Sequence, residues 1–219
     1  TPPYGYSFNG GLSTSTSVFN GLIAGNYTVV ITDSEGCQTT MSNLIVTQPP
    51  VLILTVDTTR NPSCTGDCDG VIQVTASQGS GGFEYSIDGI NYQASGIFTN
   101  LCAGGYTIFV RDIQGCITSV PVTLSQPTQV IANATITSDY NGFDVTCNGA
   151  CDGTATATPS GGSPLTSGLY QYQWSVAGAT TQSVSGLCAN TLYTVTVTDA
   201  NGCIDVDSVI LGEPTTVAA

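Results

Sequence analysis

The feature that most constrains this chain is an internal repeat. An eleven-residue block occurs three times, as YTVVITDSEGC (27–37), YTIFVRDIQGC (106–116) and YTVTVTDANGC (193–203). Alternating aromatic residues precede each copy, and a strand pattern that ends in Gln-Pro or Glu-Pro follows it. Self-similarity at a spacing of about 80 residues is the signature of a repeat architecture. The chain is therefore expected to fold as several copies of one small unit.

The repeat divides the chain into four segments. Residues 1–48 are a partial repeat, expected to be the C-terminal part of an immunoglobulin-like domain. Residues 49–126 and 127–213 are complete repeats, and residues 214–219 begin the next one. Prolines at the joints restrict the backbone, so we expect an extended, beads-on-a-string array. The abrupt start and end of the chain suggest an excerpt, or a processed piece, of a longer protein.

Each complete repeat contains about seven short strand patterns separated by Gly- and Asn-rich turns. This pattern predicts an all-β fold of immunoglobulin-like β-sandwiches. Trp174 lies on the expected third strand, where such domains bury a large aromatic side chain. Tyr27, Tyr106 and Tyr193 open the penultimate strand, where a tyrosine corner places its hydroxyl against upstream backbone.

Composition excludes several functions. The net charge is −13, with two arginines, no lysine and no histidine, so a basic surface for nucleic acid is excluded. Without histidine the chain lacks the commonest general base and metal ligand. Glu84 and Asp88 lie on the same side of an alternating strand, where solvation explains them. No apolar run is long enough to cross a membrane. We therefore expect no enzyme.

The nine cysteines occupy four equivalent positions per repeat, and the partial repeat keeps only Cys37, with Ile23 at the third position. Zinc would need all four ligands, and the spacing of the second pair does not form a knuckle. A redox pair needs a helix start, and none is predicted. Disulfides are the favoured interpretation, as in small secreted domains.

Four cysteines allow three pairings. We favour pairs inside each repeat, namely Cys68–Cys102, Cys64–Cys116, Cys151–Cys188 and Cys147–Cys203, with the partner of Cys37 outside this chain segment. One alternative stays open. In a simple immunoglobulin topology Cys64 and Cys116 lie at opposite ends, and Cys64 would then reach Cys203 of the following repeat.

Two weaker patterns involve acidic and aromatic residues. The acidic residues near the cysteines form a tentative calcium site, made of Asp69, Asp112, Asp152 and Asp199. The alternative is that Asp-Gly and Asp-x-x-Gly are ordinary turn formers. Tyr170, Tyr172 and Trp174 could stack on sugar, but at period two they more simply form a core-facing edge. No other cofactor is expected.

The motifs Cys-x-Gly-x-Cys-Asp-Gly and Tyr-Thr-Val-x-Val-Thr-Asp-x-x-Gly-Cys resemble the SprB repeat of Bacteroidetes gliding-motility adhesins. The similarity covers "VTCNGACDGTATATPSGGSP" and "SCTGDCDG" through to the Glu-Pro and Gln-Pro joints. The resemblance implies an extracellular cell-surface filament exported by type IX secretion. It implies no catalytic residue. Ile23 and the extra residue in "CANTLY" depart from the pattern.

These observations favour a structural or adhesive module that gives a filament a stiff stalk. The expected partners are neighbouring repeats of the same polypeptide, a surface polysaccharide or the substratum, and the secretion and motility machinery of the cell surface. The alternative is a carbohydrate-binding or accessory β-sandwich module of a large secreted protein. A cation-dependent stiffener is a third possibility.

Overall fold

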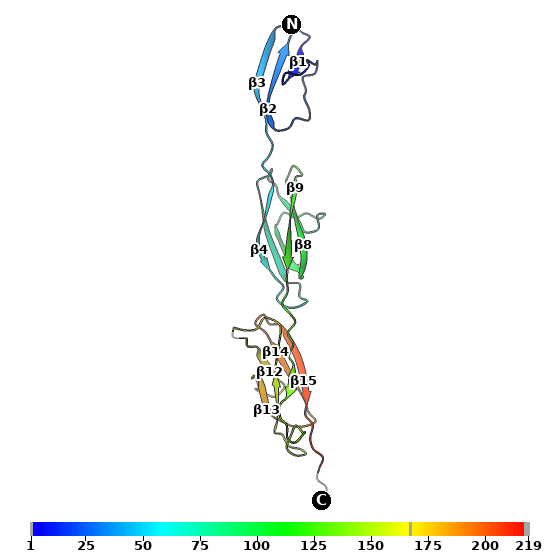
Figure 1. Ribbon diagram of the computed structural model, residues 1–219, viewed down its shortest axis with the longest axis vertical. Helices are drawn as coiled ribbons and strands as arrows, with labels where there is room; N and C mark the ends of the chain where they lie inside the picture. Colours follow the sequence, from blue (N-terminus) through cyan, green and yellow to red (C-terminus); the bar gives the residue numbers. More distant parts are fainter. Residues whose placement is uncertain (1, 167, 217–219) are drawn as a thin grey trace. The chain divides into compact units, whose positions relative to one another are not determined.

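The computed structural model describes residues 2–166 and 168–216. In this part of the chain all regular secondary structure is β: fifteen strands form five three-stranded sheets (Figure 1). The same residues include no helix that could cross a membrane. The expected all-β fold is confirmed.

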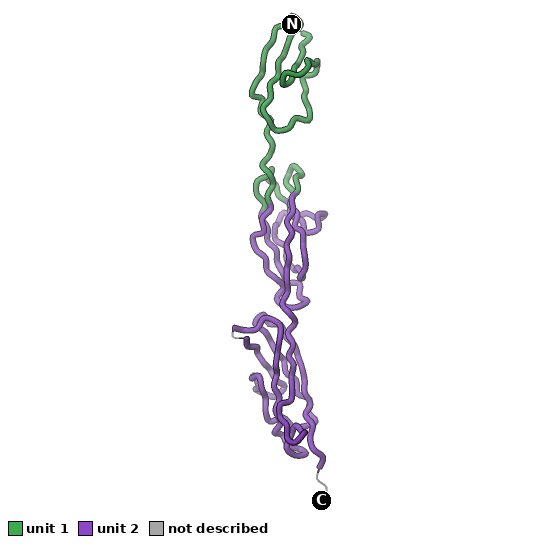
Figure 2. Tube along the Cα trace, in the orientation of Figure 1, with its two compact units in different colours: residues 1–53, 76–83, 111–117 green, residues 54–75, 84–110, 118–219 purple. Residues whose placement is uncertain are grey.

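Contacts between Cα atoms divide the chain into two compact units (Figure 2). The first unit contains residues 1–53, 76–83 and 111–117, and the second contains 54–75, 84–110 and 118–219. The repeat boundaries derived from the sequence are a separate division and stay a prediction.

The first unit contains one antiparallel sheet in the order β1-β2-β3. Its strands are β1 (Gly5–Phe8), β2 (Gly25–Thr32) and β3 (Gln38–Val46). Apolar packing is thin here. Val29 is buried, and Phe8 stacks on Phe19 and Tyr27 with ring centroids 4.7 and 5.0 Å apart. Aromatic pairs therefore supply much of the packing against this sheet.

Residues 53–124 form two more sheets, β4-β5-β7 and β6-β8-β9. The first contains β4 (Ile53–Arg60), β5 (Gly70–Ser77) and β7 (Ile97–Leu101). The second contains β6 (Glu84–Ser86), β8 (Gly104–Arg111) and β9 (Ile117–Leu124). Alternate residues of β5 are buried, including Ile72, Val74 and Ala76, as a strand with one core face requires.

Residues 134–210 form the last two sheets, β10-β11-β13 and β12-β14-β15. The first contains β10 (Ala134–Ile136), β11 (Gly153–Ala157) and β13 (Ser183–Leu187). The second contains β12 (Gln171–Trp174), β14 (Leu192–Thr198) and β15 (Ile204–Ile210). One cluster of buried residues joins both sheets, so these residues form a β-sandwich.

Trp174 is the largest side chain in that cluster and is 2% exposed. Its indole Nε1 donates a hydrogen bond to the carbonyl oxygen of Thr181, at 3.0 Å, so the buried polar atom is satisfied. Tyr170 and Tyr172 are partly buried against the same cluster, as a core-facing edge should be. Burial also raises the pKa of the Tyr172 hydroxyl.

The three expected corner tyrosines bond upstream backbone. Tyr27 and Tyr106 donate to the carbonyl oxygens of Ile23 and Cys102, at 2.6 and 2.8 Å. The Tyr193 hydroxyl instead accepts from the backbone N–H of Cys188, at 2.9 Å. The additional residue in "CANTLY" separates this last pair by five positions instead of four. The corner therefore tolerates the insertion by changing the direction of its hydrogen bond.

Candidate functional site

Seven of the nine cysteines, and the aspartates singled out with them, lie in two kinds of turn, each present in more than one copy. We call residues 62–69 and 145–152 the cysteine turns. We call residues 33–37, 112–116 and 199–203 the Asp-Gly-Cys hairpins.

In the first cysteine turn, one carboxylate closes the loop. The backbone N–H and the hydroxyl of Ser63 both donate to the Asp69 carboxylate, each at 2.9 Å. These bonds favour the charged form and therefore lower the pKa of Asp69. The bond from the Ser63 N–H contributes most to this shift. The exposed Arg60 guanidinium lies 3.5 Å from the same carboxylate. Because solvent screens this ion pair, it adds little to the stability of the turn.

The second cysteine turn has the same design. The Thr146 hydroxyl donates to the Asp152 carboxylate at 2.6 Å, and the Thr146 N–H donates to it at 3.1 Å. The hydroxyl contributes most to lowering the pKa of Asp152. Asp69 and Asp152 therefore act as the turn formers that Asp-Gly predicts.

Two disulfides attach the cysteine turns to their own sheets. Cys68 bonds Cys102, and Cys151 bonds Cys188. Strand register explains both pairs, because Gly70 lies opposite Leu101 and Gly153 lies opposite Leu187. Each cysteine turn therefore meets the residue that follows β7 or β13.

The preferred outer pairs are not formed, which corrects the sequence interpretation. Cys64 bonds Cys203, with their Cα atoms 5.6 Å apart, so neither Cys64–Cys116 nor Cys147–Cys203 exists. The geometric reason is the length of β9. Asn61 and Gly66, on either side of Cys64, bond Ser125 and Gln126, which follow β9, whereas Cys116 precedes it. The eight extended residues of β9 span about 26 Å, far beyond the reach of a disulfide.

A buried carboxylate holds the third hairpin, which carries Cys203, in its turn conformation. Asp199 is 2% exposed, and its Oδ1 accepts the N–H groups of Asn201 and Cys203, each at 2.9 Å. Its Oδ2 accepts the N–H of Ser163, at 2.8 Å. A Cβ at Gly162, which has φ +61°, would lie 2.6 Å from that Oδ2, so only glycine fits there.

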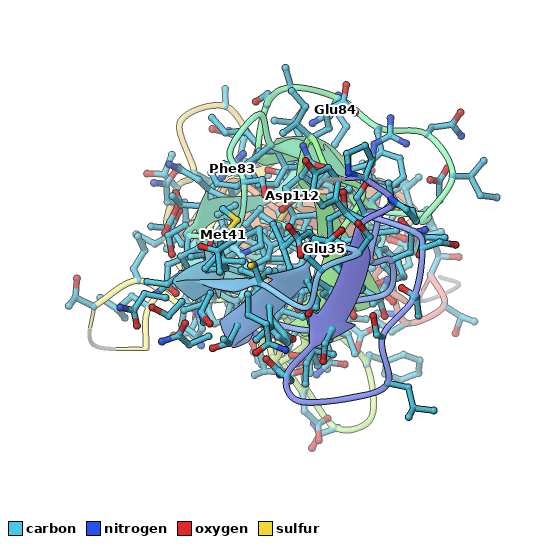
Figure 3. The ribbon with its side chains drawn as sticks, turned by 90° about the horizontal axis from the view of Figure 1, so that it is seen from above. Glu35, Met41, Phe83, Glu84 and Asp112 are labelled. Atoms are coloured by element: carbon cyan, nitrogen blue, oxygen red, sulfur yellow. A yellow bond between two sulfur atoms is a disulfide. The ribbon has the colours of Figure 1, made fainter. Side chains whose placement is uncertain are left out.

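The other two hairpins repeat this arrangement. Asp112, labelled in Figure 3, is 4% exposed and accepts the N–H groups of Gln114, Cys116 and Ser80. The Ser80 bond contributes most to lowering the pKa of Asp112. In the first hairpin Asp33 accepts the N–H groups of Glu35 and Cys37. Three sequence copies thus give three copies of one cysteine-presenting turn.

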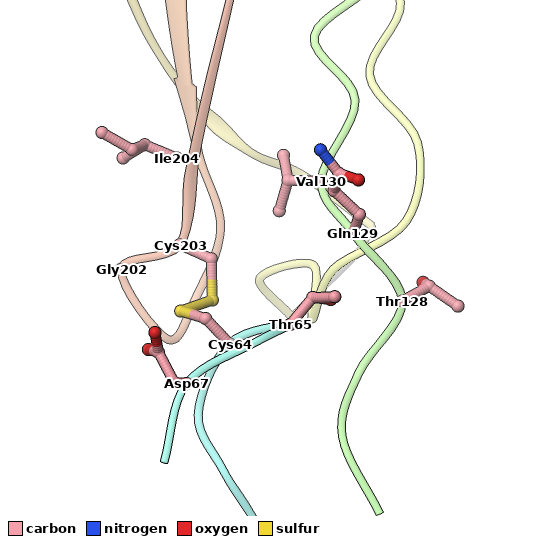
Figure 4. A pocket seen from close by; sticks show the side chains of 9 residues that line it. All are labelled: Cys64, Thr65, Asp67, Thr128, Gln129, Val130, Gly202, Cys203 and Ile204. Atoms are coloured by element: carbon pink, nitrogen blue, oxygen red, sulfur yellow. A yellow bond between two sulfur atoms is a disulfide. The ribbon is translucent and has the colours of Figure 1, made fainter. Parts of the chain in front are cut away.

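Polar contacts surround the Cys64–Cys203 bond. The Asn201 side-chain amide donates to the carbonyl oxygen of Ser63, at 3.0 Å. Thr65 donates its hydroxyl to the carbonyl oxygen of Pro127, at 2.7 Å, and Gly66 donates its N–H to Gln126 Oε1, at 2.9 Å. The disulfide lines a hollow that also includes Asp67, Thr128 and Val130 (Figure 4). The bond is therefore part of a specific joint.

The four aspartates of the tentative calcium site each accept hydrogen bonds from their own turn, and Asp112 and Asp199 each accept one more from a serine outside it. Among residues 2–166 and 168–216, no three His, Cys, Asp or Glu side chains gather closely enough to hold a metal ion. The structure thus favours the turn-forming role of these carboxylates.

Three cysteines carry free thiols. All nine cysteines lie in the described part of the chain, and Cys37, Cys116 and Cys147 are unbonded and exposed. Cys147 belongs to a cysteine turn, whereas Cys37 and Cys116 belong to Asp-Gly-Cys hairpins. Ile23, at the position of the missing inner cysteine, is 79% exposed. Each free thiol is therefore one half of a kind of bond that exists elsewhere in the chain.

Sequence reasoning missed the joint's supporting residues, Ser63, Thr65, Gln126 and Asn201. One signal for them was present. Gln126 and Glu213 occupy equivalent places before the joint prolines, and each accepts the N–H of a glycine in the nearby cysteine turn. An alignment of the repeats against each other would have marked this position as more than a linker.

The fold and the site together define a class: an all-β chain of small sheets that carries two short-range disulfides and one long-range disulfide. The SprB repeat family model matches the chain at residues 56–91 and 143–179. The chain thus carries SprB repeats at these two places. Each match includes one complete cysteine turn, so the family pattern and the site coincide.

Several solved structures are similar at low identity. Drosophila OTK extracellular domains 3–5 match with 14% identity, a TM-score of 0.33, and 97% of this chain and 85% of that chain covered. Fibronectin(III)-like modules of Clostridium thermocellum CbhA match with 15% identity, a TM-score of 0.29 and coverage of 74% and 94%. Bacteroides ovatus SGBP-B, in complex with a mixed-linkage heptasaccharide, matches with 13% identity, a TM-score of 0.20 and coverage of 96% and 60%. The search of curated proteins found no match.

Proposed function

We propose that this chain is a load-bearing section of an extracellular surface filament of the gliding-motility type. Its repeats act as spacers, and its disulfides limit how far the filament stretches. The proposal includes export by type IX secretion and assigns no catalytic role to any residue.

The cysteine chemistry supports the location. Three disulfides persist in oxidising compartments and are rare in the cytosol. The strongly acidic composition, with a net charge of −13, favours solubility and repulsion between filaments. Both features suit a protein held outside the cell, and the SprB repeat matches agree with that placement.

The observation that carries the proposal is the Cys64–Cys203 bond. It connects residues 139 positions apart, so tension applied to the two chain ends passes from Cys64 directly to Cys203. The sheets between these cysteines are removed from the covalent load path. If they unfolded in the reduced protein, the chain would lengthen by roughly 480 Å, at about 3.5 Å per residue. The oxidised protein cannot undergo that extension.

Single-molecule pulling tests this proposal. The chain is tethered by residues added at its two ends and stretched with and without a thiol reductant, and Cys203→Ser is the matched control. We expect the oxidised chain to lack the extension between residues 64 and 203, and the reduced chain to show it in full. Cys203→Ser without reductant should show about half of it, because its inner bridges still close 34 and 37 of the 139 positions. Equal extension in all three would contradict a load-bearing cross-link.

A cellular measurement tests location and role. Antibody against this segment should label intact cells of the source organism. Deleting both SprB segments from the parent protein should shorten the filament and weaken attachment or gliding. Unlabelled intact cells, or unchanged attachment and gliding despite surface exposure, would count against the proposed role.

The second candidate is glycan binding. A shallow hollow lies beside Tyr170, Tyr172, Thr180 and Thr198 on β12 and its neighbours. Tyr170 donates its hydroxyl to the carbonyl oxygen of Gly161, at 2.7 Å, and both rings pack on the core cluster. Binding of soluble polysaccharide by the isolated chain, abolished by Tyr172→Ala and retained by Cys203→Ser, would favour this role over the spacer.

A further inference from the structure

The free thiols are of two complementary kinds. Cys147 lies in a cysteine turn, like bonded Cys64, and Cys116 lies in an Asp-Gly-Cys hairpin, like bonded Cys203. We propose that Cys147 forms a disulfide with the Asp-Gly-Cys hairpin of an adjoining repeat. Cys116, which lies in such a hairpin, forms the same kind of disulfide with the cysteine turn of another repeat. This inference goes beyond the spacer role, because it concerns how repeats are joined whatever they carry.

The surroundings of Cys147 reproduce those of Cys64. Gly149 donates its N–H to Glu213, at 2.7 Å, as Gly66 does to Gln126. Asn148 donates to the carbonyl oxygen of Pro214, at 3.4 Å, as Thr65 does to that of Pro127. Cys147 also lines a hollow with Pro214, Thr215 and Thr216, the equivalents of three residues that surround the bonded joint. The residues around Cys147 are thus already arranged like those around Cys64, which bond a hairpin.

The hairpin of Cys116 reproduces the hairpin of Cys203. In each, one aspartate Oδ1 accepts the N–H of the cysteine and of the residue two positions before it, and Oδ2 accepts a serine N–H. The occupant of the Cys147 turn is known by analogy, because the same two kinds of turn are bonded at Cys64–Cys203. In solution, a second copy of this chain supplies the hairpin.

The hairpins differ at their second and third positions, and the third position sets their preference. Asn201 donates its side-chain amide to the carbonyl oxygen of Ser63, whose equivalent beside Cys147 is Thr146. Gln114 holds this position in the Cys116 hairpin and carries an amide. Glu35 holds it in the Cys37 hairpin. Its carboxylate has no N–H to donate and would repel the carbonyl oxygen of Thr146. The Cys116 hairpin is therefore the better partner, by about fivefold, the factor that one net hydrogen bond is worth.

Bond formation needs a two-electron oxidant, and a small-molecule disulfide such as oxidised glutathione serves. The Cys147 thiolate attacks the glutathione disulfide, releasing one glutathione thiolate and leaving a mixed disulfide on Cys147. The Cys116 thiolate of the second copy then attacks the Cys147 sulfur and releases the second glutathione. The two thiol protons end on the two reduced glutathione molecules.

Three variants of the full chain, each with one free thiol, test the inference. One keeps Cys147, through Cys37→Ser and Cys116→Ser. The second keeps Cys116 and the third keeps Cys37, each with the other two replaced by serine. The three replaced cysteines are exposed and unbonded, so all variants should share one melting temperature. Chains are mixed in a glutathione buffer at 0.15 M salt, and non-reducing electrophoresis follows the dimers.

We expect the Cys147 chain to link to the Cys116 chain faster than either chain links to itself, and about fivefold faster than it links to the Cys37 chain. Linkage to the Cys37 chain should be slower, and Glu35→Gln should raise it. In denaturant these preferences should vanish, because the thiols then react without the joint. Homodimers forming as fast as the mixed dimer in folded protein, or no mixed dimer at all, would overturn the proposal.

Discussion

The two cysteine turns have nearly the same sequence and local structure, yet only one makes an outer bond. Both are closed by an aspartate, Asp69 or Asp152, and both carry an inner disulfide to their own sheet. Cys64 bonds Cys203, whereas Cys147 is exposed and unbonded. The difference lies in whether an Asp-Gly-Cys hairpin faces the turn, and not in the turn itself.

The inner and outer cysteines of the cysteine turn therefore have different structural roles. The inner cysteine is placed by strand register and belongs to the fold of a single sandwich. The outer cysteine is placed by the joint, where the bond of Cys64 connects residues 139 positions apart. Removing the two kinds of bond should therefore have different consequences.

The largest expected effect is on the inner bridge. Cys188→Ser breaks a bond across 37 positions, and loop-closure entropy predicts a loss of about 4 kcal/mol in the free energy of unfolding. The chain's single tryptophan, Trp174, lies in the same core cluster, so its fluorescence during denaturant unfolding reports this loss. Cys116→Ser removes an exposed and unbonded thiol, so it is the control and should leave the same transition unchanged. An equal shift in the control would show that the loss does not come from the inner bridge.

A smaller loss is expected at the hairpin. Asp199→Ala removes the acceptor for three N–H groups, which should cost about 2–3 kcal/mol at a buried charged group. Asp199→Asn keeps an oxygen acceptor and should cost less. Thiol labelling of Cys203 after mild reduction would show whether the turn opens. If Asp199→Ala leaves both stability and labelling unchanged, the carboxylate does not hold the hairpin.

The cysteine turns should also make stability depend on pH. The pKa values of Asp69 and Asp152 are lower in the folded protein than in the unfolded chain. Their contribution is complete above the unfolded value, near pH 4, and is lost as the pH falls through the folded value. Melting temperatures between pH 7 and pH 2 measure this loss. Thr146→Val removes the main donor to Asp152 and should flatten the profile, and an unchanged profile would exclude that bond as its source.

Calcium is expected to have the smallest effect. The carboxylates of Asp69, Asp112, Asp152 and Asp199 already accept hydrogen bonds from their own turns. Chelator and added calcium should therefore leave the melting temperature unchanged. A rise with calcium that Asp152→Asn abolishes would restore the calcium site and would make the cysteine turn a cation site as well as a joint.

Much of the fold could be predicted from the sequence, because it depends on local patterns. The alternation of apolar and polar residues predicted the strands, and Trp174 indicated the core. The Cys68–Cys102 pair follows because the two cysteines flank neighbouring strands. The outer pair could not be fixed this way: the favoured pairs were wrong, and the Cys64–Cys203 alternative, left open because of the immunoglobulin topology, is the bond that forms. Its partner depends on which end of β9 faces the next repeat, and strand spacing within one repeat does not contain that information.

The supporting residues of the joint were missed for a related reason. Gln126 and Asn201 are ordinary polar residues in a linker and a turn, and nothing in their own positions marks a contact. Their role comes from side-chain hydrogen bonds to backbone 60 and 138 positions away. Such long-range polar contacts leave no periodic signal in a sequence.

Disulfide mapping tests the central claim most directly. A protease that cuts before aspartate separates the outer cysteines of unreduced protein, placing Cys64 in residues 57–66, Cys116 in 112–138, Cys147 in 144–151 and Cys203 in 199–204. The account predicts that mass spectrometry will find peptide 57–66 joined to peptide 199–204, and that reduction will separate them. Finding 57–66 joined to 112–138, or 144–151 joined to 199–204, would place the outer bond inside one repeat and contradict it.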